Sequence, residues 1–280
     1  MKWRGRRTSS NIEDRRGMGG AARTGGIGVI GLIIALVVGA VFGIDITPLL
    51  QGGATMQSSA PAGPNEIDDE SEAFVATVLA ETEDVWGEVF ANSGYQYSEP
   101  RLVLYEGGTV SACGAAQSAM GPFYCPGDET VYLDTQFFEV MRGQLGAGGE
   151  FARAYVIAHE VGHHVQNELG VLGEVNALRA RMSRTDSNAM SVRVELQADC
   201  YSGIWARAAS DRLQLTEQDI RDALTTAARI GDDALQRAQG GQVVPDSFTH
   251  GSSAQRQRWF MQGFDSGDPG ACDTFQRRDL

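Results

Sequence analysis

Several residue types are scarce in this chain, and each scarcity narrows what the protein can be. Its 280 residues include only four histidines and four cysteines. No cysteines stand in a CxxC pair, which argues against a cysteine-ligated zinc site of the finger type. No segment repeats itself, so a repeat architecture is not expected. Lysine occurs once against 22 arginines, a bias that we attribute to nucleotide composition and not to function.

Positive charge is also scarce, except at the start of the chain. The formal net charge is −13, and residues 1–24 carry seven Lys or Arg against two acids. Residues 25–280 therefore carry −18. Such an acidic surface argues against nucleic acid as a partner. It also argues against an anionic membrane surface as a docking face, beyond any anchor.

One apolar run is long enough to cross a membrane. Residues 27–44 contain no charge and no proline, and Gly25 and Gly26 extend the run to 20 residues. A signal-peptide core is shorter, and residues 45–48 do not form a small-residue cleavage site. The excess of Lys and Arg before the run predicts a cytoplasmic N-terminus. The sequence thus predicts a single-pass protein of a bacterial cytoplasmic membrane, although cleavage and release of the anchor remain open.

This topology divides the chain into four parts. Residues 1–24 form a basic cytoplasmic N-terminus, residues 25–44 a transmembrane helix, and residues 45–66 a flexible Gly-, Ser- and Pro-containing linker. Residues 67–280 are long enough for one extracytoplasmic domain with its own core. The oligomeric state cannot be read from the sequence.

The pattern in residues 67–280 predicts an α+β domain that is mostly helical. Helical spacing marks residues 72–91, and two short stretches rich in Val, Leu and Tyr read as strands, at 101–105 and 130–133. Further helices are expected at 136–145, 150–169, 173–184, 188–209, 216–238 and 253–263. Residues 130–134 are the candidate edge strand for pairing with a substrate backbone, and an internal structural strand is the alternative.

The most informative motif is His159-Glu160-Val161-Gly162-His163. It lies within the expected helix at 150–169, where positions four apart share a face, so His159 and His163 can bind one metal ion. Glu160 projects about 100° away, within reach of a water held at that ion. The helix is largely apolar around these residues and should be buried, and a buried polar cluster needs partners. The motif therefore predicts a metal site and not a surface pair of histidines.

A catalytic zinc site needs a third protein ligand. Gln166 and Leu169 stand where the metzincin pattern requires Gly and His, and His164 points away from His163 on the helix. Glu195 and Asp199 are the better candidates, because they lie four apart on one face of the next long helix. We expect Glu195 to bind the metal and Asp199 to accept the free ring N–H of a ligand histidine.

The fourth histidine, His250, precedes the helix at 253–263 in a loop of Thr, His, Gly and Ser. It could face the site and hydrogen-bond the oxyanion formed during attack on a carbonyl. A solvated loop histidine is the alternative, and spacing alone does not separate the two.

The cysteines suit an oxidising compartment. Cys113 and Cys125 bracket a short Gly- and Pro-containing loop, and Cys200 and Cys272 could tie the C-terminal tail to the helix that carries Glu195. Three pairings are possible, and the sequence favours these two disulfides without settling them.

The order HExxH and then a helix with Glu-x-x-x-Asp resembles the gluzincin zinc peptidases. That resemblance implies that His159, His163 and Glu195 bind zinc, that Glu160 is the general base, and that Asp199 orients a ligand. It also implies a zincin-like fold with a small sheet before the HExxH helix.

The whole chain further resembles a bacterial family of membrane-anchored neutral zinc metallopeptidases. The resemblance runs from MKWRGRR and SNIEDRRG, at residues 1–7 and 10–17, through the motifs above and residues 249–251 to residues 263–269 and Cys272. It implies zinc-dependent cleavage of peptide bonds without a defined substrate, and we expect one Zn²⁺ and peptides or unfolded proteins as substrates. Ligand type alone leaves manganese, cobalt and iron open. The alternative is a non-catalytic zinc-stabilised binding module of the cell envelope.

Overall fold

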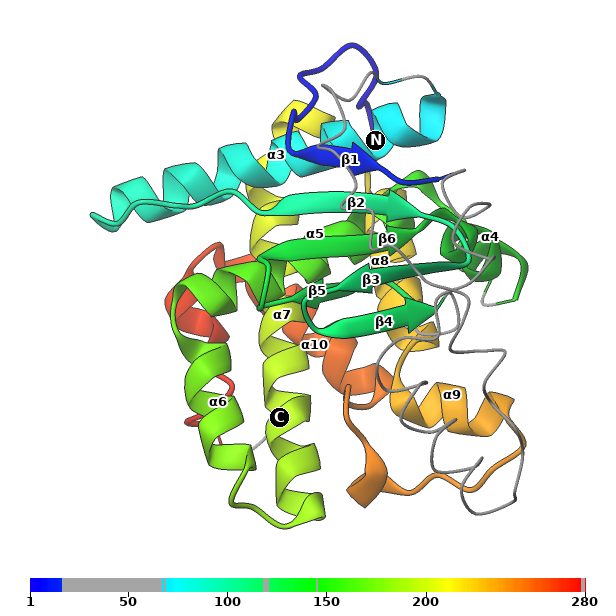
Figure 1. Cartoon of the computed structure of the whole chain (residues 1–280), viewed down its shortest axis with the longest axis vertical. Helices are drawn as coiled ribbons and strands as arrows, with labels where there is room; N and C mark the ends of the chain where they lie inside the picture. Colours follow the sequence, from blue (N-terminus) through cyan, green and yellow to red (C-terminus); the bar gives the residue numbers. More distant parts are fainter. Residues whose placement is uncertain (17–66, 68, 118–120, 145, 278–279) are drawn as a thin grey trace, which may run out of the picture.

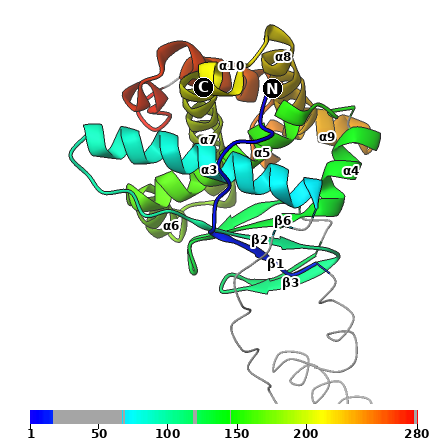
Figure 2. The same ribbon diagram turned by 90° about the horizontal axis from the view of Figure 1, so that it is seen from above.

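The computed structural model describes residues 1–16, 67, 69–117, 121–144, 146–277 and 280. Helices lie mainly on one face of a small sheet, so the described part is α+β and mostly helical, as expected (Figures 1 and 2). The predicted transmembrane helix and the linker lie outside the described residues. Among those that are described, no helix has the length and apolar character needed to cross a bilayer.

The sheet has four strands in the order β1 (Ile12–Asp14), β2 (Arg101–Tyr105), β6 (Thr130–Asp134) and β5 (Phe123–Cys125). β1, β2 and β6 run parallel, and β5 is antiparallel to β6. A separate hairpin of β3 (Gly108–Ser111) and β4 (Gly114–Gln117) follows β2.

The prediction of residues 130–134 as an edge strand is wrong. β6 pairs on both sides, with β2 and with β5, and all five of its residues are buried. A strand buried on both faces reads as a continuous apolar run, which explains its composition. β1 and β5 are the outer strands of the described sheet.

The first residues belong to the same folded unit as the rest. β1 pairs in register with β2, so Ile12 lies opposite Leu102 and Asp14 opposite Leu104. Ile12 is buried in the main core together with Trp3. The expected boundary between a separate segment 1–24 and the domain 67–280 therefore does not describe residues 1–16.

Each expected helix has a counterpart, but those expected at 173–184 and 188–209 begin two and four residues earlier, and the one expected at 216–238 is broken in two. Their bounds are α3 (Glu70–Asn92), α4 (Thr135–Gly143), α5 (Glu150–Glu168), α6 (Val171–Arg179), α7 (Arg184–Leu213), α8 (Glu217–Arg229), α9 (Asp232–Ala238) and α10 (Ser253–Ser266). Two 3-10 turns, η3 (Pro245–Ser247) and η4 (Pro269–Cys272), flank α10. The helix expected at 216–238 is broken into α8 and α9 at Gly231, where an added Cβ would lie 2.5 Å from the backbone nitrogen of Ser253. This close approach requires glycine and lets α9 begin at Asp232, whose carboxylate is used below.

α5 is the central helix of the core. Phe151 stacks on Trp205 of α7, and Tyr155 meets Phe260 of α10 edge-on. α7 and α10 cross so closely that a Cβ at Gly203 would lie 2.0 Å from the carbonyl oxygen of Phe260. The helices that carry the motif residues are thus fixed against each other by packing.

Both favoured disulfides are present. Cys113–Cys125 joins the β3–β4 hairpin to β5, and Cys200–Cys272 joins α7 to η4 after α10. All four cysteines are used, as an oxidising compartment would allow.

Candidate metal centre

α5 and α7 bring His159, His163 and Glu195 together. Their ligand atoms all lie within 4.8 Å of one another. Nε2 of His159 is 3.1 Å from Oε2 of Glu195, and Nε2 of His163 is 3.5 Å from Oε1 of the same carboxylate. The two rings are nearly perpendicular, at 86°, with centroids 4.9 Å apart. Two residues from one helix and one from the next therefore converge on a common point.

Gly162, inside the motif, permits this convergence. A Cβ at this position would lie 3.0 Å from the carbonyl oxygen of Ala198 and 3.2 Å from its Cα. A larger residue would push α5 away from α7 between the two histidines and the two acids that face them. The glycine is thus the contact point that sets the spacing of the site.

The outer nitrogen of each motif histidine has its own partner. Nδ1 of His159 lies 2.9 Å from Oδ1 of Asp199, and Nδ1 of His163 lies 2.8 Å from Oε1 of Gln166. The amide nitrogen of Gln166 donates to the carbonyl of Val194 and to Oε1 of Gln197. The oxygen of Gln166 is therefore the atom that faces His163, and it can only accept.

This arrangement fixes the tautomers of the neutral rings. Nδ1–H donates in both His159 and His163, so Nε2 of each ring carries a lone pair. Both lone pairs face the carboxylate of Glu195. In the neutral rings, three acceptors at such distances repel each other, and either a proton on a ring or a metal cation among them relieves this repulsion. Two imidazoles and one carboxylate are also the donor set of a catalytic zinc site with an open position, so these residues fit a zinc ion.

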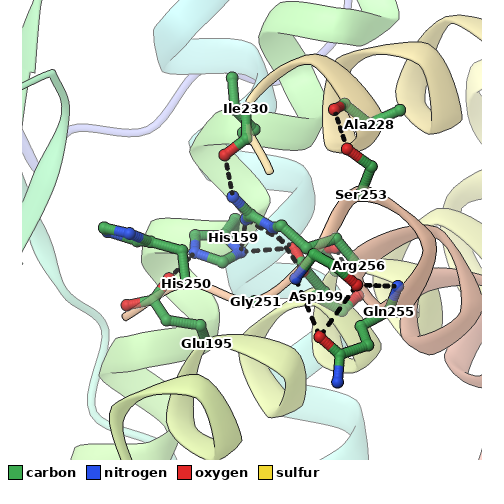
Figure 3. A network of polar contacts seen from close by, with 12 residues as sticks. His159, Glu195, Asp199, Ala228, Ile230, His250, Gly251, Ser253, Gln255 and Arg256 are labelled. Atoms are coloured by element: carbon green, nitrogen blue, oxygen red, sulfur yellow. Dashed lines mark hydrogen bonds and ion pairs between the residues drawn. The ribbon is translucent and has the colours of Figure 1, made fainter. Parts of the chain in front are cut away.

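Asp199 is at the centre of a buried network (Figure 3). Its Oδ1 accepts from the hydroxyl of Tyr155 at 2.5 Å and from His159. Arg256 of α10 donates to both oxygens, from Nε to Oδ2 at 2.8 Å and from Nη2 to Oδ1 at 2.9 Å. Arg256 Nη1 also donates to the carbonyl of Ile230, at the end of α8. The acid that orients His159 is thereby held from α5 and α10, and its partner Arg256 is held in turn from the end of α8.

The electrostatics of this cluster favour added positive charge. Burial lowers the pKa of His159, but the charge and hydrogen bonds of Asp199 and Glu195 outweigh it and raise that pKa to about 10. Burial raises the pKa of Glu195, but His163 and His159 hold it well below its usual range. Asp199 has a pKa of about 2 despite its burial, because Arg256 and His159 favour its charged form. A site that attracts a proton this strongly also attracts a metal cation.

Glu160 is buried beside the cluster, one residue after His159 on α5. Its charge is one of those that raise the pKa of His163, after the larger effect of Glu195. His164 is directed elsewhere, as the sequence predicts. Its Nε2 donates to the carbonyl of Ser98 and its Nδ1 accepts from the hydroxyl of Tyr124, which ties α5 to the region of β5.

His250 lies at the edge of the site on the loop before α10 (Figure 3). Its side chain is half exposed, and its Nδ1 donates to Oδ1 of Asp232 at 3.2 Å. Oδ2 of Asp232 accepts the backbone N–H groups of Thr249, His250 and Gly251. The hydrogen bond to Asp232 raises the pKa of His250, and the charge of Glu195 adds to this effect. His250 is thus held by a structured loop that lies close to Glu195.

Sequence reasoning missed four residues of this site: Tyr155, Gln166, Asp232 and Arg256. Tyr155 and Gln166 carried a usable signal, since they lie four before His159 and three after His163 on the same helix. Arg256 contacts Asp199 across 57 positions, and Asp232 contacts His250 across 18. No local pattern marks such pairs.

Comparisons with known proteins identify a family that covers nearly the whole chain. A family described as "Putative neutral zinc metallopeptidase" matches residues 1–275. An uncharacterized protein of Escherichia coli K12, YpfJ, is 49% identical over 98% of this chain and 99% of its own length. An uncharacterized protein of Mycobacterium tuberculosis H37Rv is 49% identical over 66% of this chain and 65% of its own. No solved structure matches the chain.

Proposed function

The chain belongs to this family of neutral zinc metallopeptidases, and we propose that it is a zinc-dependent endopeptidase with His159, His163 and Glu195 as the zinc ligands. The proposal rests on one observation: Nε2 of His159 and Nε2 of His163 both face the carboxylate of Glu195. A structural zinc site usually closes with four protein ligands, whereas three leave a position for water and substrate. Zinc bound there would lower the pKa of its water to about 7 and polarise the scissile carbonyl.

Glu160 is the proposed general base. It would take a proton from the attacking water and pass it to the nitrogen of the leaving amine. Its burial on the helix that carries both histidines, one residue after His159, supports this role. No movement between helices is then needed to bring base and ligands together.

His250 is the proposed donor to the oxyanion. Asp232 accepts from its Nδ1, so Nε2 of the protonated ring remains as a second donor. The raised pKa of His250 favours the protonated ring, which suits a group that stabilises negative charge. Asp232 also fixes the backbone of the loop, so the donor is preorganised.

Arg256, Tyr155 and Asp199 are positioning residues in this proposal. They touch no substrate but hold the ring of His159 in one tautomer and one orientation. Partners of this kind typically change metal affinity or activity 10–100-fold when removed. Gln166 has the same role for His163.

The alternative is a non-catalytic zinc-stabilised module that binds other envelope proteins. Glu160 separates the two, because a purely structural site needs no base. The full-length protein, purified with zinc, should cleave members of a diverse peptide library and stop when a chelator removes the metal. Glu160→Gln should retain zinc and fold but lose about 10²–10⁴-fold in turnover.

The exposed Glu174→Gln is the matched control on α6 and should cleave like the parent. If Glu160→Gln cleaves as fast as the parent, Glu160 is not the base. Cleavage by none of the proteins, with zinc bound in each, would favour the binding module.

Peptides or unfolded proteins outside the cytoplasm are the proposed substrates. Two disulfides support this compartment, because disulfides persist in oxidising environments. The acidic character of residues 25–280 makes nucleic acid a poor partner there.

A further inference from the structure

The N-terminal segment, residues 1–16, lies across the acidic helix α3 before it joins the sheet as β1 (Figure 2). We call this segment the strap. Arg6 Nε contacts Oε1 of Glu81 at 2.5 Å, and Arg7 Nη1 contacts Oε2 of Glu83 at 2.9 Å. Both glutamate side chains are only 2% exposed. The basic residues that suggest a cytoplasmic tail are therefore partners of buried acids in the main domain.

The strap supplies the polar partners of the buried Glu83 side chain. Its Oε1 accepts from the hydroxyl of Ser9 and from Nδ2 of Asn11, and its Oε2 pairs with Arg7. These three partners all come from the strap. Without it, a buried carboxylate would lose these contacts, which is costly.

Apolar and backbone contacts also attach the strap. Trp3 is 4% exposed, packs edge-on against Phe74 of α3, and donates from Nε1 to Glu150 in the first turn of α5. The backbone N–H of Leu102 donates to Asn11, and that of Arg15 donates to Leu104. Removing the strap would expose the edge of β2, a hazard that folded proteins avoid.

The strap ends where the main domain begins. Nη1 of Arg16 lies 2.7 Å from Oδ2 of Asp69, the residue that caps α3. Nη2 of Arg16 also lies 3.6 Å from Glu72. This ion pair thus joins two described residues that flank the segment 17–66, which contains the apolar run 27–44.

A single crossing of a membrane by residues 27–44 would place Arg16 and Asp69 on opposite sides of a hydrocarbon core about 30 Å thick. That separation cannot coexist with an ion pair at 2.7 Å or with the pairing of β1 and β2. We propose that the strap remains docked on the main domain in the membrane-associated protein, so that residues 1–16 and 67–280 occupy the same side. Residues 27–44 then do not separate them as a single transmembrane span.

The positive-inside rule counts Lys and Arg in the short segments next to an apolar run, and by that count alone the strap would stay in the cytoplasm. In the folded chain, however, Arg4, Arg6, Arg7 and Arg16 pair with carboxylates of the main domain. These ion pairs favour a docked strap over a separate cytoplasmic tail.

The test uses the full chain in right-side-out and inverted membrane vesicles with a membrane-impermeant thiol reagent. Thr8→Cys reports on an exposed strap position, and Glu217→Cys on a main-domain side chain that is 92% exposed. The parent, whose cysteines are all in disulfides, gives the background. We expect both variants to react in the same type of vesicle. Reaction in opposite types would overturn the proposal.

Docking itself is tested at the neighbouring position. Ser9 is 3% exposed and faces Glu83, so Ser9→Cys should be protected in vesicles and react only after denaturation. Ser9→Cys reacting as fast as Thr8→Cys would mean that the strap is not docked in the membrane. The comparison of Thr8 with Glu217 does not use Ser9, so it stands if the Ser9 variant folds poorly. Neither measurement requires peptidase activity.

Discussion

Arg256 donates a hydrogen bond to each carboxylate oxygen of Asp199, at 2.8 and 2.9 Å, and neither side chain is more than 3% exposed. Two parallel hydrogen bonds of this kind fix the plane of the carboxylate as well as its distance from the guanidinium. The fixed carboxylate of Asp199 in turn orients the ring of His159 through its hydrogen bond with Nδ1. An arginine on the last long helix therefore sets the direction in which a proposed metal ligand points.

Replacing Arg256 should weaken metal binding. Arg256→Lys keeps the charge but loses the fork, so we expect zinc affinity to fall by about 10–100-fold. Competition with a fluorescent chelator would measure it. Arg258→Lys, at an exposed position one half-turn later, is the control and should bind zinc like the parent. Equal affinities for the two variants would remove Arg256 from the support of the site.

Replacing Glu195 should remove a metal ligand. Glu195→Ala leaves two imidazoles without the carboxylate that faces them, so the purified variant should retain little zinc by metal analysis. Asp211→Ala, at an exposed position on the same helix, should keep a full complement. Unchanged zinc in Glu195→Ala would exclude this residue as a ligand.

Asp232 should set the alkaline limit of activity. Its hydrogen bond raises the pKa of His250, so removing its charge lowers that pKa. If protonated His250 stabilises the oxyanion, Asp232→Asn should lose turnover at a lower pH than the parent, while His250→Ala should be slow throughout with zinc intact. A pH–rate profile that does not move in Asp232→Asn, with full activity in His250→Ala, would return His250 to a solvated loop residue.

The strap should contribute to global stability. Trp3→Ala removes a buried indole and its hydrogen bond to Glu150, so unfolding should cost about 3–5 kcal/mol less. Thermal or urea unfolding of the full chain would measure this change. Thr8→Ala, on the exposed side of the strap, should unfold like the parent. Equal midpoints for the two variants would show that the strap adds nothing to the fold.

The parts of the site that the sequence predicts are those set by local geometry. His159 and His163 follow from one helical turn, and Glu195 and Asp199 from another, because i and i+4 share a face on any helix. The structure brings these four together as the pattern suggested.

The parts that the sequence did not predict depend on contacts between distant segments. β1 is three residues long and carries two acids, so no strand pattern marks it until β2 lies beside it. Gly231 breaks a helical pattern because Ser253 lies against it, a neighbour 22 positions away. β6 was taken for an edge strand because the zincin resemblance calls for one before the HExxH helix, and the three-residue β5 on its outer side was not predicted.

The disulfide Cys200–Cys272 has a consequence for the proposed ligand His163. It fixes η4, and the carbonyl of Cys272 accepts from the amide of Gln197. Gln197 accepts in turn from Gln166, whose oxygen faces Nδ1 of His163. A chain of hydrogen bonds through two side-chain amides thus connects the disulfide to the ring of His163 and to its tautomer. In newly made protein with free thiols, the carbonyl of Cys272 would not be fixed in this way. The affinity for metal would therefore increase as the disulfide forms.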